Sequence, residues 1–205
     1  MAQSADSRPE NPMRPKSRPI SYVAFDKKTG RILHVHGRFS VEHNQYVEID
    51  IGEMREKLAK DKMILDRLTD RDAENLDIIR APEEGPSRAL AYGMGIIDVN
   101  RKEIVGKPRL TLSAPKLELD GDGKDSIKIE IEAETDGNSA GIVDEDIKVT
   151  TTRGKLSARG GIVRLVRGKA TITLTSVGET AHKVRIAATA PSGHYRSGYL
   201  TVAFV

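Results

Sequence analysis

Three histidines, His34, His36 and His43, form the densest set of candidate metal ligands in the sequence. In an extended strand, His34 and His36 would share one face with their α-carbons about 7 Å apart. Two imidazoles at this spacing can hold Zn²⁺ or Ni²⁺ if a third ligand arrives, and His43 or Glu42 could supply it. The alternative is a metal-free pair on the solvent face of a hairpin. We favour this alternative and expect no metal and no cofactor.

Two acidic clusters could also attract a cation. Residues 120–125 read Asp-Gly-Asp-Gly-Lys-Asp, which begins like a calcium-binding loop. Lys124 stands where a further oxygen ligand would help, and the twelfth position is the apolar Ile131, so a tight loop between strands is the better interpretation. For residues 144–146, Asp-Glu-Asp, we likewise expect a solvated loop that keeps an edge strand from pairing with other chains.

Motifs for catalysis are missing from the sequence. There is no Gly-x-Ser-x-Gly elbow, and Gly93-Met-Gly95 is followed by Ile-Ile-Asp instead of the third glycine of a dinucleotide-binding loop. The lack of cysteine removes thiolate nucleophiles, thiolate metal sites and disulfides together. We predict no catalytic residue and no enzyme. A hydrolase with paired carboxylates within residues 19–108 is the least favoured alternative.

Composition narrows the class of partner. The 33 basic and 30 acidic residues are interspersed and leave a net charge of only +3, unlike the concentrated charge of a nucleic-acid interface. No apolar run approaches the ~18 residues of a membrane span, and residues 1–18 lack the apolar core of a signal peptide. We therefore expect a protein partner, no nucleic acid, no membrane insertion, and a location in a virion or the cytoplasm.

The elements before residue 109 indicate a small α+β domain. Residues 1–18, rich in proline and basic side chains, predict a disordered arm. Short β-prone runs predict a hairpin at 22–36, a strand at 46–51 and a second hairpin at 95–105. Asp50-x-x-Glu53 is a capping box that predicts a helix at about 52–68. Thr69-x-x-Asp72 repeats the same capping pattern and suggests a short second helix to about Leu76. We assign residues 19–108 to this domain.

After Pro108 the pattern changes to strands. Ile127, Ile129 and Ile131 alternate with Lys128 and Glu130, as in an antiparallel strand with one face in a core. About seven such strands, separated by Gly, Asp, Ser and Pro, follow one another to the end of the sequence. The expected strands are 110–112, 127–133, 147–151, 162–165, 170–175, 184–188 and 200–204. This spacing predicts an immunoglobulin-like (Ig-like) β-sandwich over residues 109–205.

The same region resembles the bacterial Ig-like domains of the invasin and intimin type. The resemblance rests on Asp125-Ser-Ile-Lys-Ile-Glu-Ile-Glu-Ala133 before Asp136-Gly137, on 149–157 and 168–176, and on Val184-Arg-Ile-Ala-Ala188. The loop 138–141 departs from the family, where a proline is common. The resemblance implies a spacer or adhesion surface without catalytic residues, and it does not extend to residues 19–108.

These expectations lead to a non-enzymatic structural or binding protein. Because such modules also occur in phage particles, we expect a phage-particle or injection-machine component, a decoration or tail-associated protein displaying its Ig-like module. The alternative is a cytoplasmic or non-classically secreted module for protein binding or adhesion. A homo-oligomer is compatible with either hypothesis, although no heptad repeat demands one.

Overall fold

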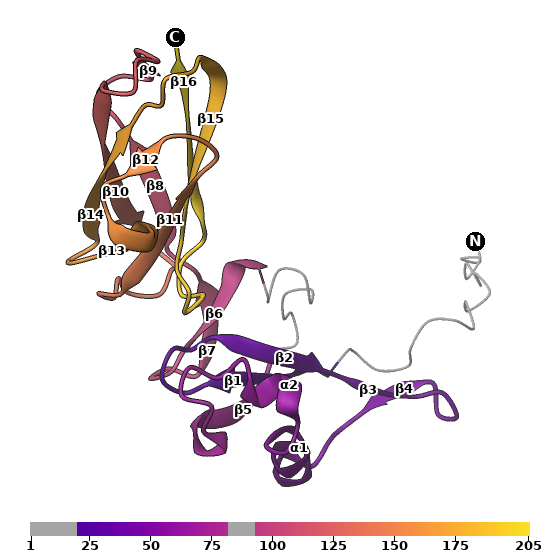
Figure 1. Cartoon of the computed structure of the whole chain (residues 1–205). Helices are drawn as coiled ribbons and strands as arrows, with labels where there is room; N and C mark the ends of the chain where they lie inside the picture. The colour runs from indigo at the N-terminus through magenta and orange to yellow at the C-terminus, as the bar shows by residue number, and fades with distance from the viewer. Residues whose placement is uncertain (1–19, 82–92) are drawn as a thin grey trace, which may run out of the picture.

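The computed structural model of the chain describes residues 20–81 and 93–205 (Figure 1). The arm predicted for residues 1–18 lies outside these residues. In the described part of the chain, no helix has the length and apolar character that crossing a membrane requires.

The first sheet has the strand order β2-β1-β5 and is antiparallel throughout. Its strands are β1 (Tyr22–Asp26), β2 (Ile32–His36) and β5 (Leu76–Arg80). Every residue of β1 is buried, because helices cover one face of the sheet and a hairpin covers the other. The predicted hairpin at 22–36 is confirmed, with an irregular register between Ala24 and Phe25.

Helices α1 (Ile51–Leu58) and α2 (Lys62–Leu65) replace the single helix predicted for 52–68. The predicted cap is present, because the Asp50 carboxylate accepts a hydrogen bond from the Glu53 amide at 2.8 Å. The prediction of one continuous helix was wrong. The Asp61 side chain accepts a hydrogen bond from the Met63 amide at 2.8 Å and begins a new helix. Such side chain to backbone bonds compete with the helical ladder.

The helix suggested within 69–76 is reduced to a 3₁₀ turn, η1 (Ala73–Asn75), capped by Asp72. Leu76 instead begins β5, a strand that the sequence analysis missed. β5 pairs with β1 along its whole length, and this pairing outweighs the local cap signal. The strand predicted at 46–51 is also shorter: β4 (Gln45–Val47) pairs with β3 (Arg38–Ser40), and α1 begins at Ile51.

The predicted second hairpin is confirmed as β6 (Gly95–Asp98) and β7 (Glu103–Gly106). It docks on the first hairpin at Gly30, whose carbonyl accepts a hydrogen bond from the Ile97 amide at 2.8 Å. Gly30 has φ of 70°, and a Cβ there would lie 2.1 Å from the Ile97 carbonyl oxygen, so the close approach requires glycine. Ile97 packs in one cluster with Phe25 and Ile79.

Two sheets packed face to face follow, with strand orders β12-β14-β10-β8 and β13-β11-β15-β16-β9 (Figure 1). All seven strands predicted after Pro108 are present, together with the short β9 and β12. Their bounds are β8 (Arg109–Ser113), β9 (Glu118–Leu119), β10 (Ser126–Glu134), β11 (Asp146–Thr151), β12 (Lys155–Leu156), β13 (Ile162–Arg164), β14 (Lys169–Thr175), β15 (Ala181–Thr189) and β16 (Gly198–Phe204).

The inner faces of these two sheets form one aliphatic core. Ile129, Ile131, Ile147, Leu174 and Phe204 are fully buried in it. Their neighbours along each strand point outward, which confirms the alternation expected from the sequence. Residues 109–205 thus form an Ig-like β-sandwich.

The segment that leads into the sandwich is hydrogen-bonded on both sides. The Gly106 amide donates to the Asn138 carbonyl at 3.0 Å, and the Gly106 carbonyl accepts from the Ala140 amide at 2.9 Å. Further along, the Arg196 amide donates to the Pro108 carbonyl at 2.8 Å, and the Leu110 amide donates to the Arg196 carbonyl at 3.0 Å. The boundary expected at 108 and 109 therefore lies in a tied stretch of chain, which orients the sandwich on the N-terminal part (Figure 1).

Candidate functional site at the junction

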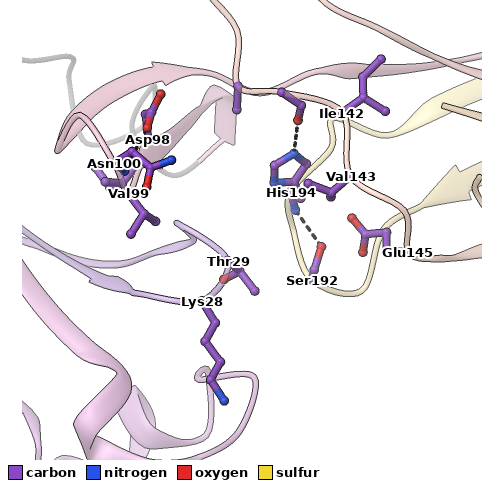
Figure 2. Close-up of a pocket in the computed structure, with 13 residues that line it drawn as sticks. Lys28, Thr29, Asp98, Val99, Asn100, Ile142, Val143, Glu145, Ser192 and His194 are labelled. Carbon is purple, nitrogen blue, oxygen red and sulfur yellow. Dashed lines mark hydrogen bonds between the residues drawn. The ribbon is translucent and has the colours of Figure 1, made fainter. Parts of the chain in front are cut away.

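A hollow of about 430 Å³ lies between the N-terminal part and the sandwich, and we call it the junction hollow. Three elements line it: the β1–β2 turn with Lys28, the β6–β7 hairpin with Asp98 and Val99, and the sandwich with Ile142 and His194 (Figure 2). Because its walls come from segments far apart in the sequence, the hollow exists only in the folded chain.

The segment 141–143, just before β11, has no strand partner, and two neighbouring side chains hold it. His194 Nε2 lies 2.8 Å from the Gly141 carbonyl oxygen. The Tyr195 hydroxyl accepts from the Val143 amide at 2.8 Å and donates to the Val143 carbonyl at 2.7 Å. These bonds satisfy polar backbone groups that a sheet would otherwise pair.

We call these bonds from His194 and Tyr195 the clamp, and the segment they hold carries two apolar residues that line the hollow. Ile142 is 42% exposed and Val143 is 43% exposed. Ile142 also leans on Gly168, where a Cβ would lie 3.3 Å from its Cδ1 and Cγ2 atoms. Because these bonds hold the backbone of the segment, Ile142 and Val143 form a partly exposed apolar surface on an ordered stretch of chain.

Glu145 adds a negative charge to the same wall. Its Oε1 atom is buried and has no hydrogen-bond partner among the described residues, although its backbone carbonyl accepts from the Leu165 amide at 2.8 Å. Burial raises the pKa of Tyr195, and the charges of Glu145 and Asp144 raise it further against the opposing hydrogen bond from Val143. The tyrosine therefore keeps its proton, and with it the bond to the Val143 carbonyl, at neutral pH.

The polar groups of the hollow suit binding better than catalysis. Ser192 Oγ accepts from the backbone amide of His194 at 3.0 Å, and no bond joins this hydroxyl to the imidazole in the described structure (Figure 2). His194 Nε2 is engaged by a carbonyl, so it carries the proton and donates. A nucleophile needs hydrogen-bond contact with a free base, and this pair does not provide it.

The structure brings together two of the three candidate metal ligands. His34 and His36 share a face of β2 with their rings stacked, the centroids 5.6 Å apart. His43 lies in the β3–β4 turn, with its Nδ1 atom 3.0 Å from Ser40 Oγ. Within residues 20–81 and 93–205, no three His, Asp or Glu side chains are grouped to hold an ion.

A second hollow, of about 530 Å³, lies beside the histidine pair and contains three carboxylates. Asp50 caps helix α1. Glu48 pairs with Arg80 at 2.9 Å, and Glu53 pairs with Lys57 one helical turn away. Each of these carboxylates thus has a local partner: a backbone amide for Asp50, Arg80 for Glu48 and Lys57 for Glu53.

The acidic loop at 120–125 is hydrogen-bonded to itself. Asp122 accepts from the amides of Lys124 and Asp125 at 2.8 and 2.9 Å. Asp125 accepts from Lys116 Nζ at 2.6 Å and from the Asp120 amide at 3.0 Å. These bonds hold the pKa values of Asp122 and Asp125 below their usual range. Asp122 and Asp125 thus accept hydrogen bonds from within the loop and from Lys116, as expected of a tight loop between strands.

The acidic triplet 144–146 differs from its predicted role. Asp146 begins β11, which pairs with both β13 and β15 and is an inner strand. Glu145 lines the junction hollow. The sequence analysis also missed Ile142 and Val143, because the groups that hold them, His194 and Tyr195, are about fifty residues away and give no local signal.

No protein-family model matches the chain, and no curated protein matches it. Solved structures do match. The D0–D1 domain of intimin is 22% identical with a TM-score of 0.38, over 48% of this chain and 48% of that chain. A 282-residue C-terminal fragment of intimin, solved in complex with the intimin-binding domain of the translocated intimin receptor, is 23% identical with a TM-score of 0.36, over 45% and 31%.

A glycosyl hydrolase family 2 member from Bacteroides cellulosilyticus is 13% identical with a TM-score of 0.39, over 90% of this chain but 21% of that chain. The chain spans about half the length of the intimin D0–D1 structure and less of the other two. The structural neighbours thus include intimin domains, as the sequence resemblance predicted. These low values concern the arrangement of strands and carry neither activity nor partner to this chain.

Proposed function

We propose that this chain is a non-catalytic protein-binding module that contacts its partner through the junction hollow. The observation that carries the proposal is the clamped pair Ile142 and Val143, whose apolar side chains stay more than two-fifths exposed. Burying them against a partner removes apolar surface from water at about 25 cal/mol per Å². Since the backbone is already held, little conformational entropy is lost on binding.

The mixed chemistry around this pair supports a protein partner. A protein interface usually has apolar side chains at its centre and charged groups at its margin. Lys28, Asp98 and Glu145 supply both signs of charge around the hollow. The partner would place an apolar side chain on Ile142 and Val143 and charged groups opposite Lys28 and Asp98.

We further propose that residues 19–108 form an α+β unit that attaches to a larger assembly, and that residues 109–205 form the projecting Ig-like unit. The tied stretch at Gly106 and Pro108 supports a fixed orientation between the two. The assembly is proposed to be a phage particle or an injection machine. The alternative is a soluble partner in the cytoplasm.

Site-specific photo-crosslinking tests this proposal. A photoreactive phenylalanine analogue replaces Val143 in the full chain, and cells that make the assembly are irradiated and fractionated by sedimentation. We expect an adduct with one defined protein. Recovery of the adduct in the particle fraction supports a particle component, and recovery with a small soluble protein supports the alternative.

The matched control places the same analogue at Leu117, which is 53% exposed beside β9 at the far end of the sandwich (Figure 1). Equal adducts from both positions would show unspecific contact and overturn the proposed site. Absence of any adduct at 143, with the chain sedimenting as free protein, would overturn the proposed function.

A further inference from the structure

A separate hollow of about 720 Å³ lies next to the junction hollow and is lined by cationic side chains. Its lining includes Arg31 from the turn just before β2, Arg67 from the turn after α2, and Lys107 from the segment leading into the sandwich. Asp61 is the carboxylate among its lining residues, and one oxygen of Asp61 caps helix α2. The hollow thus has an excess of positive charge.

A backbone carbonyl lies near each of the two arginines. Arg67 Nη1 donates to the Leu33 carbonyl at 2.8 Å, and Arg31 Nη1 lies 3.5 Å from the Arg67 carbonyl oxygen. Neither arginine forms an ion pair with a residue of the described ranges 20–81 and 93–205. Both guanidinium groups therefore keep a charge that no carboxylate of those residues pairs with, and the bond to the Leu33 carbonyl orients that of Arg67.

Lys107 brings the third cation into a buried position. Lys107 as a whole is only 9% exposed. Burial lowers the pKa of Lys107, and the nearby positive charge of Arg31 lowers it further. Crowding of like charges in a partly buried space is unfavourable, and an anion bound between them would relieve it.

Arg31 also extends across the contact between the two parts. A Cβ on Gly193, in the loop between β15 and β16, would lie 3.3 Å from Arg31 Nε and 3.5 Å from its Cδ. Gly193 has φ of 76°, so glycine both permits this turn and leaves room for the arginine. The cationic hollow is therefore assembled only when the sandwich is docked.

We propose that Arg31, Arg67 and Lys107 bind an oxyanion of the phosphate class in this hollow. Guanidinium groups suit the tetrahedral, multiply charged phosphate group because they donate paired hydrogen bonds to its oxygens. The volume exceeds that of a single phosphate ion, so the group could be free or carried on a small organic ester. The bound anion would join the β1–β2 hairpin to the segment entering the sandwich.

Isothermal titration calorimetry of the full chain tests the site, with inorganic phosphate as the probe and sodium chloride holding the ionic strength constant. We expect one phosphate per chain. Arg31→Gln should weaken binding at least about tenfold, because it removes a charge-assisted hydrogen bond. Arg67→Lys keeps the charge but loses the planar fork, and should weaken binding less. A titration with glycerol phosphate shows whether the site is suited to a free phosphate ion or to a phosphate ester. Equal affinity for the two probes indicates the free ion, and tighter binding of glycerol phosphate indicates an ester.

The control variant is Arg101→Gln, which removes an exposed cation on the β6–β7 turn outside the hollow. It should bind phosphate as the parent does. Three results would overturn the proposal: no saturable heat with phosphate, equal weakening by Arg101→Gln, or acetate binding as tightly as phosphate. Circular dichroism of each variant confirms that lost binding does not reflect lost structure.

Discussion

The hydroxyl of Tyr195 contacts both polar groups of Val143, accepting from its amide at 2.8 Å and donating to its carbonyl at 2.7 Å. The hydroxyl thereby satisfies the two backbone groups that a neighbouring strand would otherwise pair, for a residue fifty-two positions earlier. A residue of the loop between β15 and β16 thus determines how the segment before β11 is held. The segment held in this way contributes Ile142 and Val143 to the lining of the junction hollow.

Replacing Tyr195 by phenylalanine should destabilise the chain by about 1–3 kcal/mol, because the variant keeps the ring but leaves the two Val143 groups unpaired. Urea unfolding at neutral pH measures the free energy. Hydrogen exchange of the Val143 amide should accelerate in the same variant.

Tyr199→Phe is the matched control, since Tyr199 is 62% exposed on the outer face of β16. It should change stability by no more than about 0.5 kcal/mol. Equal losses from the two variants would contradict the role given to the Tyr195 hydroxyl.

Replacing Gly30 by alanine should loosen the contact between the two hairpins. The added Cβ would meet the Ile97 carbonyl oxygen at 2.1 Å, and the positive φ is unfavourable for alanine. We expect a loss of more than about 1 kcal/mol in urea unfolding, with faster exchange of the Ile97 amide. Gly137→Ala, which meets nothing within 4 Å, should stay close to the parent.

Asp26 should make stability depend on acidic pH. It is fully buried and accepts hydrogen bonds from Thr69 Oγ1 at 2.7 Å, Thr29 Oγ1 at 2.9 Å and the Lys28 amide at 2.9 Å. Burial raises the pKa of Asp26, but these bonds outweigh burial and hold the pKa below its ordinary 3.8. Its contribution to stability is therefore complete above that value and is lost as pH falls through the lower folded-state pKa.

Asp26→Asn removes this titration. At neutral pH the variant should be less stable by about 1–3 kcal/mol, because an amide cannot accept all of these bonds. The gap between parent and variant in urea unfolding should narrow as pH falls below the ordinary pKa. A gap that stays constant down to strongly acidic pH would show that the Asp26 charge contributes nothing.

Core truncation tests the sandwich itself. Ile147→Ala should cost about 2–5 kcal/mol, because Ile147 is fully buried between the two sheets. Ile162→Ala, on the neighbouring edge strand β13 and 53% exposed, should cost far less. Thermal unfolding of both variants checks the difference, and similar melting temperatures would contradict the assigned strand orientation.

The local alternation of apolar and polar residues was enough to predict the strands of the sandwich. Ile127, Ile129 and Ile131 recur at period two, so the faces of β10 could be assigned before any partner was known. The cap at Asp50 was likewise a local signal. The second half of the predicted helix failed because Asp61 bonds to the backbone and restarts the helix. β5 was missed because its state depends on pairing with β1.

The amino-acid sequence by itself determined which residues face a core after Pro108, and the absence of thiol and motif-based chemistry, because both depend on residue type and short-range period. Only the tertiary structure decided that Tyr195 clamps Val143, that Glu145 lines a hollow, and that Arg31, Arg67 and Lys107 meet in one space. Those sites join residues tens of positions apart. Their assembly depends on how the strands pair and how the sandwich docks, and no local pattern records that.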